Sequence, residues 1–437
     1  KLMMKTRLII VLIIISSPLL AKFSDEIKAS GIDFKHENGM TGKFYMPEII
    51  GSGLAFFDYD NDGDMDLYLV QGGNLSISVG ENTNLRDKLY RNDTIIQDHP
   101  VFVDVTESSK INSLGYGMGV ATGDFNNDGH EDIFVANYSR NQIFMNNGNG
   151  TFDLATNALP KEDIDWSVGA SVADYNNDGF LDIYVVNYVE YPLLEHVKQC
   201  LASDSSLDFC APQGFKYQAD YLYKNNGDGT FSNINIKAGL KGKESAGLGV
   251  VAADFNNDSL LDFYVANDGE YNHLWLNQGN DKFIEKALLS GVAVNMSGER
   301  EASMGVDAAD YDNDGDIDLF MTHLNKQTNT LYVNNGKGWF SDLTMAKKLG
   351  SSSFTSTGFG TFWFDYDNDG LLDLFSANGS VAKIKSEIQL KDPFPFKQPN
   401  QVWKNIGNGS YAEISNQQGL GFLRKDVSRG AALADID

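Results

Sequence analysis

The chain has 437 residues, of which 42% are hydrophobic and 12% aromatic, so it is a folded protein and too long for one ordinary compact core. Its 60 acidic residues outnumber 34 basic ones and give a formal net charge of −26. This charge excludes nucleic acid as the natural partner, because phosphate binding requires the opposite sign. The acids either serve solubility alone or include metal ligands, and their positions decide between these interpretations.

Residues 1–21 have the pattern of a secretory signal peptide. A basic start precedes an apolar run from Leu8 to Ile15, and small and turn residues follow up to Ala21. The run is too short to cross a bilayer, so a membrane anchor is the less favoured alternative. The sequence thus predicts a secreted, periplasmic or cell-surface protein with no membrane span in the mature chain. Export also favours a disulfide between the only two cysteines, Cys200 and Cys210, over two free thiols.

One nine-residue pattern organises the rest of the chain: Asp, aromatic, Asp or Asn, Asn, Asp, Gly, two variable residues, Asp. A glycine lies five residues before each copy, and a truncated seventh copy begins at Asp435. Recurrence at 50 to 80 residues indicates a repeat array with insertions. Glycine inside a strand indicates close backbone approach, as around a central axis. The six complete copies start at Asp58, Asp124, Asp174, Asp254, Asp310 and Asp365, and the glycines are Gly53, Gly119, Gly169, Gly249, Gly305, Gly360 and Gly430.

Each copy is followed by segments typical of β-strands. In the second repeat an apolar run at 133–136 precedes a strand from Ile143 that ends in an Asn/Gly turn, and Phe152 begins the next strand. With the glycine segment, each repeat has four antiparallel strands. The sequence therefore predicts an all-β, seven-bladed β-propeller of four-stranded antiparallel blades with its last blade truncated; a solenoid is the alternative.

The N-terminal segment from Phe23 to Phe34 resembles a fourth strand of these repeats. We expect it to complete the last blade and close the ring, which would remove exposed sheet edges. Because six repeats are complete and the seventh stops early, the natural chain is expected to continue past Asp437.

The nine-residue pattern has the chemistry of a calcium loop. Ca²⁺ takes six to eight oxygen ligands on a flexible loop. Positions 1, 3, 5 and 9 supply side-chain oxygens, position 7 a backbone carbonyl, and glycine at position 6 permits the sharp turn. The loop begins like an EF-hand but ends with an aspartate at position 9 and joins strands. A single copy could be an ordinary Asx turn, but six matched copies predict about six calcium sites. Ser259 replaces the glycine in the fourth loop, which is expected to be the weakest or a strained site.

The predicted metal ligands, loop by loop, are Asp58, Asp60, Asp62, Asp64 and Asp66; Asp124, Asn126, Asp128, His130 and Asp132; Asp174, Asn176, Asp178, Phe180 and Asp182; Asp254, Asn256, Asp258, Leu260 and Asp262; Asp310, Asp312, Asp314, Asp316 and Asp318; Asp365, Asp367, Asp369, Leu371 and Asp373.

The loops, glycines and turns resemble FG-GAP/VCBS repeats, as in the propeller of integrin α chains. The segments 31–34 and 47–53, Cys200, Cys210–Pro212 and Arg429–Gly430 resemble more specifically the cartilage acidic protein and bacterial ASPIC/UnbV family. The resemblance covers Phe23 to Asp437 and implies a propeller domain over residues 22–437. It also implies an integrin-like role in cell adhesion. Members of the family often carry an ASPIC/UnbV domain after the propeller.

The expected function is ligand binding. The three long insertions, 71–87, 188–220 and 379–400, lie between the second and third strands and so on the rim opposite the acidic loops. We expect a glycan or protein ligand there, and a monomer. Glu48, Tyr116, Trp166, Glu301 and Arg429 could surround the channel or merely pack the blade tops. No catalytic residues are predicted, because the six histidines share no spacing and no nucleophile motif occurs. A polysaccharide lyase and a scaffold for a further domain are the alternatives.

Overall fold

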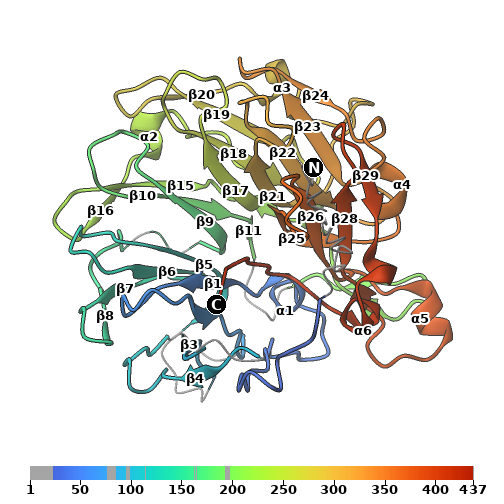
Figure 1. The fold of residues 1–437 in the computed structure, drawn as a ribbon, viewed down its shortest axis with the longest axis horizontal. Coiled ribbons are helices and arrows are strands. Elements are labelled where there is room, and N and C mark those ends of the chain that lie inside the picture. Colours follow the sequence, from blue (N-terminus) through green and yellow to red (C-terminus); the bar gives the residue numbers. More distant parts are fainter. Residues whose placement is uncertain are drawn as a thin grey trace, which may run out of the picture.

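The computed structural model describes residues 23–75, 85–94, 99–113, 115–161, 163, 165–191 and 197–436. They form six four-stranded antiparallel sheets arranged as blades around a central axis (Figure 1). From the axis outward the strands are β1 (Leu54–Phe57), β2 (Asp66–Leu69), β3 (Lys88–Asn92), β4 (Phe102–Asp104); β5 (Tyr116–Gly123), β6 (Asp132–Tyr138), β7 (Gln142–Asn146), β8 (Phe152–Leu154); β9 (Ser167–Ala173), β10 (Asp182–Asn187), β15 (Tyr221–Asn225), β16 (Phe231–Asn233).

The remaining blades are β17 (Gly247–Ala253), β18 (Asp262–Asn267), β19 (His273–Asn277), β20 (Phe283–Glu285); β21 (Ser303–Ala309), β22 (Asp318–His323), β23 (Thr330–Asn334), β24 (Phe340–Asp342); β25 (Gly358–Phe364), β26 (Asp373–Asn378), β28 (Gln401–Asn405), β29 (Tyr411–Glu413). Short pairs β11 (Val189–Glu190) with β14 (Lys216–Tyr217), β12 (Cys200–Leu201) with β13 (Leu207–Asp208), and β27 (Gln398–Pro399) with β30 (Lys425–Asp426) lie outside the blades. The helices are brief: α1 (Pro47–Ile50), α2 (Asn235–Ala238), α3 (Ala287–Ser290), α4 (Gly350–Ser353), α5 (Lys385–Gln389), α6 (Leu420–Leu423), η2 (Pro212–Gly214) and η3 (Ser415–Gln417).

Apolar side chains on both faces of the second strands explain why the blades stack. Ile133 and Val135 of β6 face the first blade, whereas Phe134 and Ala136 face the third, and all four are 0% exposed. Each pair of neighbouring complete blades thus shares one apolar cluster, as expected of strands buried on both faces. The predicted four-stranded antiparallel propeller is confirmed.

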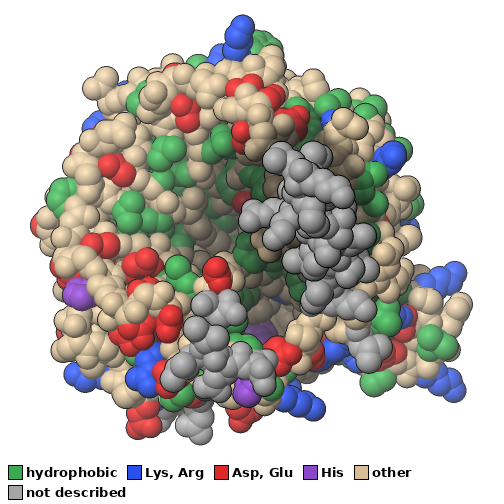
Figure 2. Space-filling view, in the orientation of Figure 1, with side chains coloured by type: hydrophobic (Ala, Val, Ile, Leu, Met, Phe, Trp, Pro, Cys, Tyr) green, Lys and Arg blue, Asp and Glu red, His purple; other side chains and the backbone are tan. Residues whose placement is uncertain are grey.

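The repeated glycines lie where the inner strands crowd together. A Cβ on Gly305 would lie 1.9 Å from the carbonyl oxygen of Phe359 in the next blade, and a Cβ on Gly53 would lie 2.8 Å from the Cα of Gly119. Space around the axis, and not backbone conformation, therefore requires glycine at six of the seven positions, whereas a Cβ on Gly169 would meet no atom closer than 3.7 Å. Figure 2 shows the hollow at the centre of the ring.

The prediction of seven blades is wrong for the residues that the structure describes, because they build six complete sheets. Residues 431–436 are extended without forming a strand, and the predicted strand at 23–34 is a turn over residues 27–31. Residues 1–21, the predicted signal peptide, and Asp437 lie outside the described residues. Across those described, no helix is both long and apolar enough to span a membrane.

The long insertions connect second and third strands, as predicted, and they close one rim of the ring. Phe209 of the second insertion packs 5.5 Å from Phe396 of the third and 5.1 Å from Phe44, measured between ring centroids. These rings join α1 and the starts of β5 and β9 in one apolar cluster. The second insertion contains a disulfide between Cys200 and Cys210.

The connection between the second and third strands of each blade is held by a side-chain hydrogen bond that the sequence analysis did not predict. In every blade an Asp or Asn just before the third strand accepts a hydrogen bond from a backbone N–H at the end of the second strand. We call this hydrogen bond the bracket. It needs only an Asp or Asn oxygen just before the third strand. Because the insertions differ in length, the number of residues between the second strand and this side chain varies, and the sequence shows no regular spacing. The acceptors are Asp87, Asn141, Asp220, Asn272, Asn329 and Asn400.

The bracket at Asp220 makes stability depend on pH. Its carboxylate accepts hydrogen bonds from Asn187 N and the Tyr184 hydroxyl, both at 3.0 Å, and burial raises the pKa of Asp220 to about 7. A carboxyl with a raised pKa binds more protons when folded. Its contribution to stability is therefore complete below its unfolded pKa, about 3.9, and is lost as the pH rises through about 7.

We expect the double substitution Asp220→Asn with Tyr184→Phe, which copies Asn141 and Phe134 of the second blade, to remove this dependence. As the pH rises from about 4 to about 8, the unfolding free energy of the variant should increase relative to that of the wild type by on the order of 2–4 kcal/mol. The change in pKa sets the upper end of this range. Urea unfolding across this pH range measures it. The prediction is contradicted if the difference in unfolding free energy between the two proteins is the same at about pH 4 and about pH 8.

Candidate metal centres

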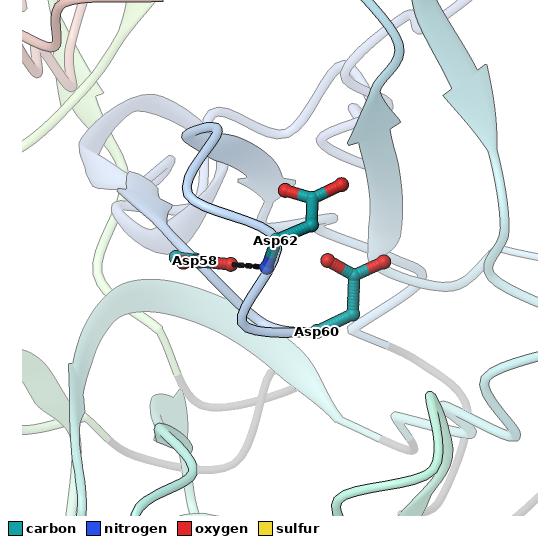
Figure 3. Close-up of side chains that lie close together, drawn as sticks. All are labelled: Asp58, Asp60 and Asp62. Atoms are coloured by element: carbon teal, nitrogen blue, oxygen red, sulfur yellow. Dashed lines mark hydrogen bonds between the residues drawn. The ribbon is translucent and has the colours of Figure 1, made fainter.

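All six acidic loops join first and second strands and so lie on one rim. Figure 3 shows the first: its backbone turns so that the carboxylates of Asp60 and Asp62 lie side by side while Asp58 accepts from the loop backbone. Asp58 accepts from Asp62 N at 3.1 Å and Gly63 N at 3.0 Å, and Asp62 accepts from Asp64 N at 3.0 Å. The same three hydrogen bonds recur in the other five loops.

The aspartate at position 9 fixes each loop to its own sheet. Asp66, 0% exposed, accepts from Tyr59 N at 3.0 Å and, across the sheet, from Asn92 N at 2.8 Å. The bond from the third-strand asparagine recurs in every blade, at 2.7–2.8 Å. Burial raises the pKa of the position-9 carboxyls, to about 7 in the first five loops and to about 6 at Asp373. Burial thus disfavours the charged form of these carboxyls, and a bound cation would stabilise it.

Backbone conformation explains two further positions. The asparagine at position 4, whose role the sequence did not reveal, has φ between 55° and 60° in all six loops. Position 6 is also left-handed, with φ from 82° to 96° at the five glycines and 69° at Ser259. Asn and Gly tolerate this region best, so Ser259 is strained, as expected. Whether its loop binds metal more weakly stays a prediction.

The loops differ in how close together they place their carboxylate oxygens. Three carboxylates have ligand atoms within 4.8 Å of one another in the first, fifth and sixth loops. In the first and sixth loops the Oδ1 atoms of Asp60 and Asp367 are buried with no hydrogen-bond partner. Burial, and then neighbouring acids, raise the pKa of Asp60 and of Asp312. These donor sets fit a hard divalent cation, because every ligand is oxygen and a buried oxygen lacks a partner. The grouped residues are Asp58, Asp60 and Asp62; Asp310, Asp312 and Asp318; Asp365, Asp367 and Asp373.

The other three loops have asparagine at position 3. Asn126 Nδ2 donates to Asp128 Oδ2 and Asn176 Nδ2 donates to Asp182 Oδ2, both at 3.0 Å. An amide N–H thus occupies the oxygens that a cation would contact, and the amide must turn before it can be a ligand. The fourth loop, with Asn256, makes no such donation among the described residues; its amide oxygen accepts from Asp258 N at 3.0 Å.

At position 7 every residue donates its backbone N–H to the position-5 carboxylate, and two of the side chains contact a neighbouring loop. Asp316 accepts from Asn257 Nδ2 at 2.9 Å, and His130 Nδ1 lies 3.0 Å from Asn61 Nδ2. The side chains of His130 and Asp316 therefore link successive loops. This leaves the backbone carbonyl as the predicted ligand at position 7.

Comparison with known proteins agrees with this repeat architecture. A family model described as FG-GAP-like repeat matches residues 58–135, 124–185, 203–265, 254–321 and 310–376. The chain belongs to the FG-GAP-like repeat family. It is similar to human cartilage acidic protein 1, with 24% identity over 368 residues covering 81% of this chain and 50% of that protein, and to the mouse protein, with 24% identity covering 75% and 48%. The chain therefore spans about half the length of these relatives.

Among solved structures, the FG-GAP-like propeller is similar to an Agrocybe aegerita lectin described as recognising non-reducing terminal N-acetylglucosamine. The TM-score is 0.46 and the identity 17%, covering 82% of this chain and 78% of that one.

Lys404 lies beside the sixth FG-GAP-like loop, as the equivalent Lys224 lies 3.5 Å from Asp178 of the third. The Lys404 ammonium pairs with Asp367 and lies 3.1 Å from Asp369 Oδ2, so a side-chain cation already offsets two of the predicted ligands. We expect Lys404→Ala to tighten calcium binding at this loop about tenfold, since removing one nearby positive charge is worth on the order of 1–2 kcal/mol. Terbium luminescence competed by calcium measures it, and exposed Lys337→Ala is the control. Equal affinity in the two variants would contradict the prediction.

A cavity of about 280 Å³ lies on the opposite rim of the FG-GAP-like propeller. Inner-strand residues Leu248, Met304 and Phe359 line it together with α1 and the segment after Cys210. The five residues named as candidates around the channel are all buried, between 2% and 8% exposed, and Arg429 among them lines the channel: Glu48, Tyr116, Trp166, Glu301 and Arg429. Sequence reasoning located this rim but not the residues of the cavity.

Proposed function

We propose that this chain is an exported calcium-binding propeller that binds a glycan or protein ligand, without catalysis, on the rim opposite its acidic loops. The observation that carries the proposal is the cavity on that rim. Its wall is apolar, with Asp268 and Arg300 among its few charged residues. Such a site, concave and apolar with a few placed polar groups, is typical of ligand recognition.

Asp268 gives the cavity a specific acceptor. One oxygen accepts from the Tyr188 hydroxyl at 2.6 Å, while the described residues make no hydrogen bond to the other. Burial raises the pKa of Asp268 to about 6, so it is charged at neutral pH. A hydroxyl or amine of a ligand would satisfy the open oxygen.

The edge of the cavity carries an exposed aromatic surface. Arg300 pairs with Glu270 at 2.5 Å and lies over the ring of Tyr271, which is 50% exposed. Aromatic faces and guanidinium groups are common anchors for sugar rings and for protein side chains. The volume of about 280 Å³ suits one sugar ring or one side chain of a larger ligand.

Residues 22–437 are the propeller domain in this proposal, after a signal peptide at 1–21, and the mature protein is a monomer. Calcium occupies the six acidic loops and stabilises the rim that lies opposite the ligand. Seven inner segments, each with its glycine, line the channel of this propeller.

A glycan array and a panel of extracellular-matrix proteins, probed in calcium, test the proposal. We expect Leu324→Trp, which fills the cavity, and Asp268→Asn each to reduce binding at least tenfold, the loss of about one ligand contact. Exposed Leu288→Trp on α3 is the matched control. Binding unaffected by both cavity variants would exclude this site, and unsaturated products from acidic glycans would favour the lyase alternative.

A further inference from the structure

The cavity on the rim opposite the acidic loops is small and mostly aliphatic. Its volume is about 280 Å³, and methionine, leucine, isoleucine and valine side chains from α1, the inner strands and the insertions form most of its wall. Met46, Ile49 and Met304 of this wall are buried, between 1% and 4% exposed. Such a wall gains free energy by covering apolar surface of a ligand, but it offers no partner to a hydroxyl group that loses water there.

Few polar groups of the cavity are free to contact a ligand. Arg300 pairs with Glu270 at the edge, so its charge is already offset. The side-chain oxygen of Gln327 accepts from a backbone N–H at 3.0 Å, and the Tyr188 hydroxyl donates to Asp268 at 2.6 Å. A sugar ring, which presents hydroxyl groups on several sides, would leave most of them without partners in this cavity.

Asp268 brings a negative charge to the cavity without a basic partner. Among the described residues it belongs to no ion pair, and Tyr188 is its one side-chain partner. Its second carboxylate oxygen is neither hydrogen-bonded nor closed off by those residues, and the side chain lines the cavity. A cationic group of a ligand would satisfy this oxygen best, because charge-assisted hydrogen bonds are roughly twice as strong as neutral ones.

We infer that this cavity takes the side chain of a lysine from a protein partner, with the ammonium on Asp268 and the four methylene groups against apolar residues such as Leu248 and Met304. This rests on the proposed function, since it names the class of ligand for the same cavity. The net charge of −26 favours a basic partner. At the mouth of the cavity Ala211 and Gln213 are exposed, so it is open to the backbone of that partner.

A lysine suits this arrangement better than an arginine. Only one oxygen of Asp268 is open, because the other accepts from Tyr188. A guanidinium binds a carboxylate best through two parallel hydrogen bonds, whereas an ammonium needs only one acceptor. A lysine side chain also buries its long apolar stem while its charge reaches a polar group, as an aliphatic cavity with one carboxylate requires.

Short peptides with blocked ends test the inference, because they isolate one side chain. Each has two glycines on either side of a central lysine, Nε-acetyl-lysine or arginine, and N-acetylglucosamine is the sugar probe. In NMR titrations of the whole chain in calcium, the lysine peptide should bind more tightly than the arginine peptide. It should also bind at least tenfold more tightly than the acetylated peptide and the sugar. Binding should persist in about 0.5 M NaCl, because an enclosed pair is screened less than surface charges.

Matched variants locate the contact. Asp268→Asn should weaken binding of the lysine peptide at least tenfold, and Leu324→Trp, which fills the apolar part of the cavity, should also weaken it. Asp153→Asn removes an exposed charge on β8 and is the control for net charge. Equal binding of the lysine and Nε-acetyl-lysine peptides, or equal effects of the two Asp→Asn changes, would overturn the inference.

The lysine assignment and the proposed function fail in different ways. A glycan that binds in this cavity in place of the lysine peptide would overturn the assignment and leave the proposed function intact. Ligands from the array or the protein panel whose binding ignores both cavity variants would overturn both, because they would place ligand recognition elsewhere on the molecule.

Discussion

Removal of calcium is expected to lower the melting temperature of this protein by on the order of 10 °C. Each loop places several carboxylates together, and burial disfavours the charged form of the position-9 aspartates. An ion that binds only the folded state at about 100 times its Kd adds about 2.7 kcal/mol per site, so several sites together have a large effect. Differential scanning calorimetry in millimolar calcium and in excess chelator measures the change.

Matched variants locate the effect in the loops. Asp60→Asn or Asp312→Asn should reduce the calcium-dependent part of Tm, because each removes a charge from a group of three carboxylates. Exposed Asp153, outside the loops, provides the control Asp153→Asn. A melting temperature that does not respond to chelator, with no ion uptake by calorimetry, would refute calcium binding.

Replacement of Arg429 by alanine is expected to cost about 3–5 kcal/mol of unfolding free energy, as for other buried charged groups whose partners are left unpaired. The guanidinium is 6% exposed and donates to four carbonyl oxygens, including Ile49 O at 2.5 Å and Gly379 O at 2.9 Å. It also lies 4.0 Å from the ring centroid of Phe359. Burial lowers the pKa of Arg429 to about 9, yet its hydrogen bonds hold α1, the sixth blade and the last inner segment together.

Urea unfolding measures this loss. Arg429→Lys should recover little, since an ammonium cannot reach carbonyls on several segments at once. Arg424→Ala is the control, because this arginine is exposed and its pairs with Asp25 and Asp426 are worth at most about 1 kcal/mol. A loss at Arg429 no greater than at Arg424 would contradict the prediction.

Local chemistry in the sequence determined the repeat. Each acidic loop forms its own hydrogen bonds within nine residues, each Asn/Gly turn ends a strand, and each glycine marks the crowded axis. Such features depend on neighbouring residues, so the four-stranded blades, the loops on one rim and the insertions on the other could be predicted. Asn61 and its equivalents escaped notice because only the backbone shows that position 4 is left-handed.

The placement of side chains in three dimensions decided the rest. The structure alone shows that Lys404 offsets the sixth loop, that Asn126 turns an amide N–H toward Asp128, and that Arg429 is buried. It also decided the number of complete blades. Rotamers and contacts between segments, such as that of Arg429 with Ile49, set these features, whereas the repeat pattern records only what one blade needs to fold.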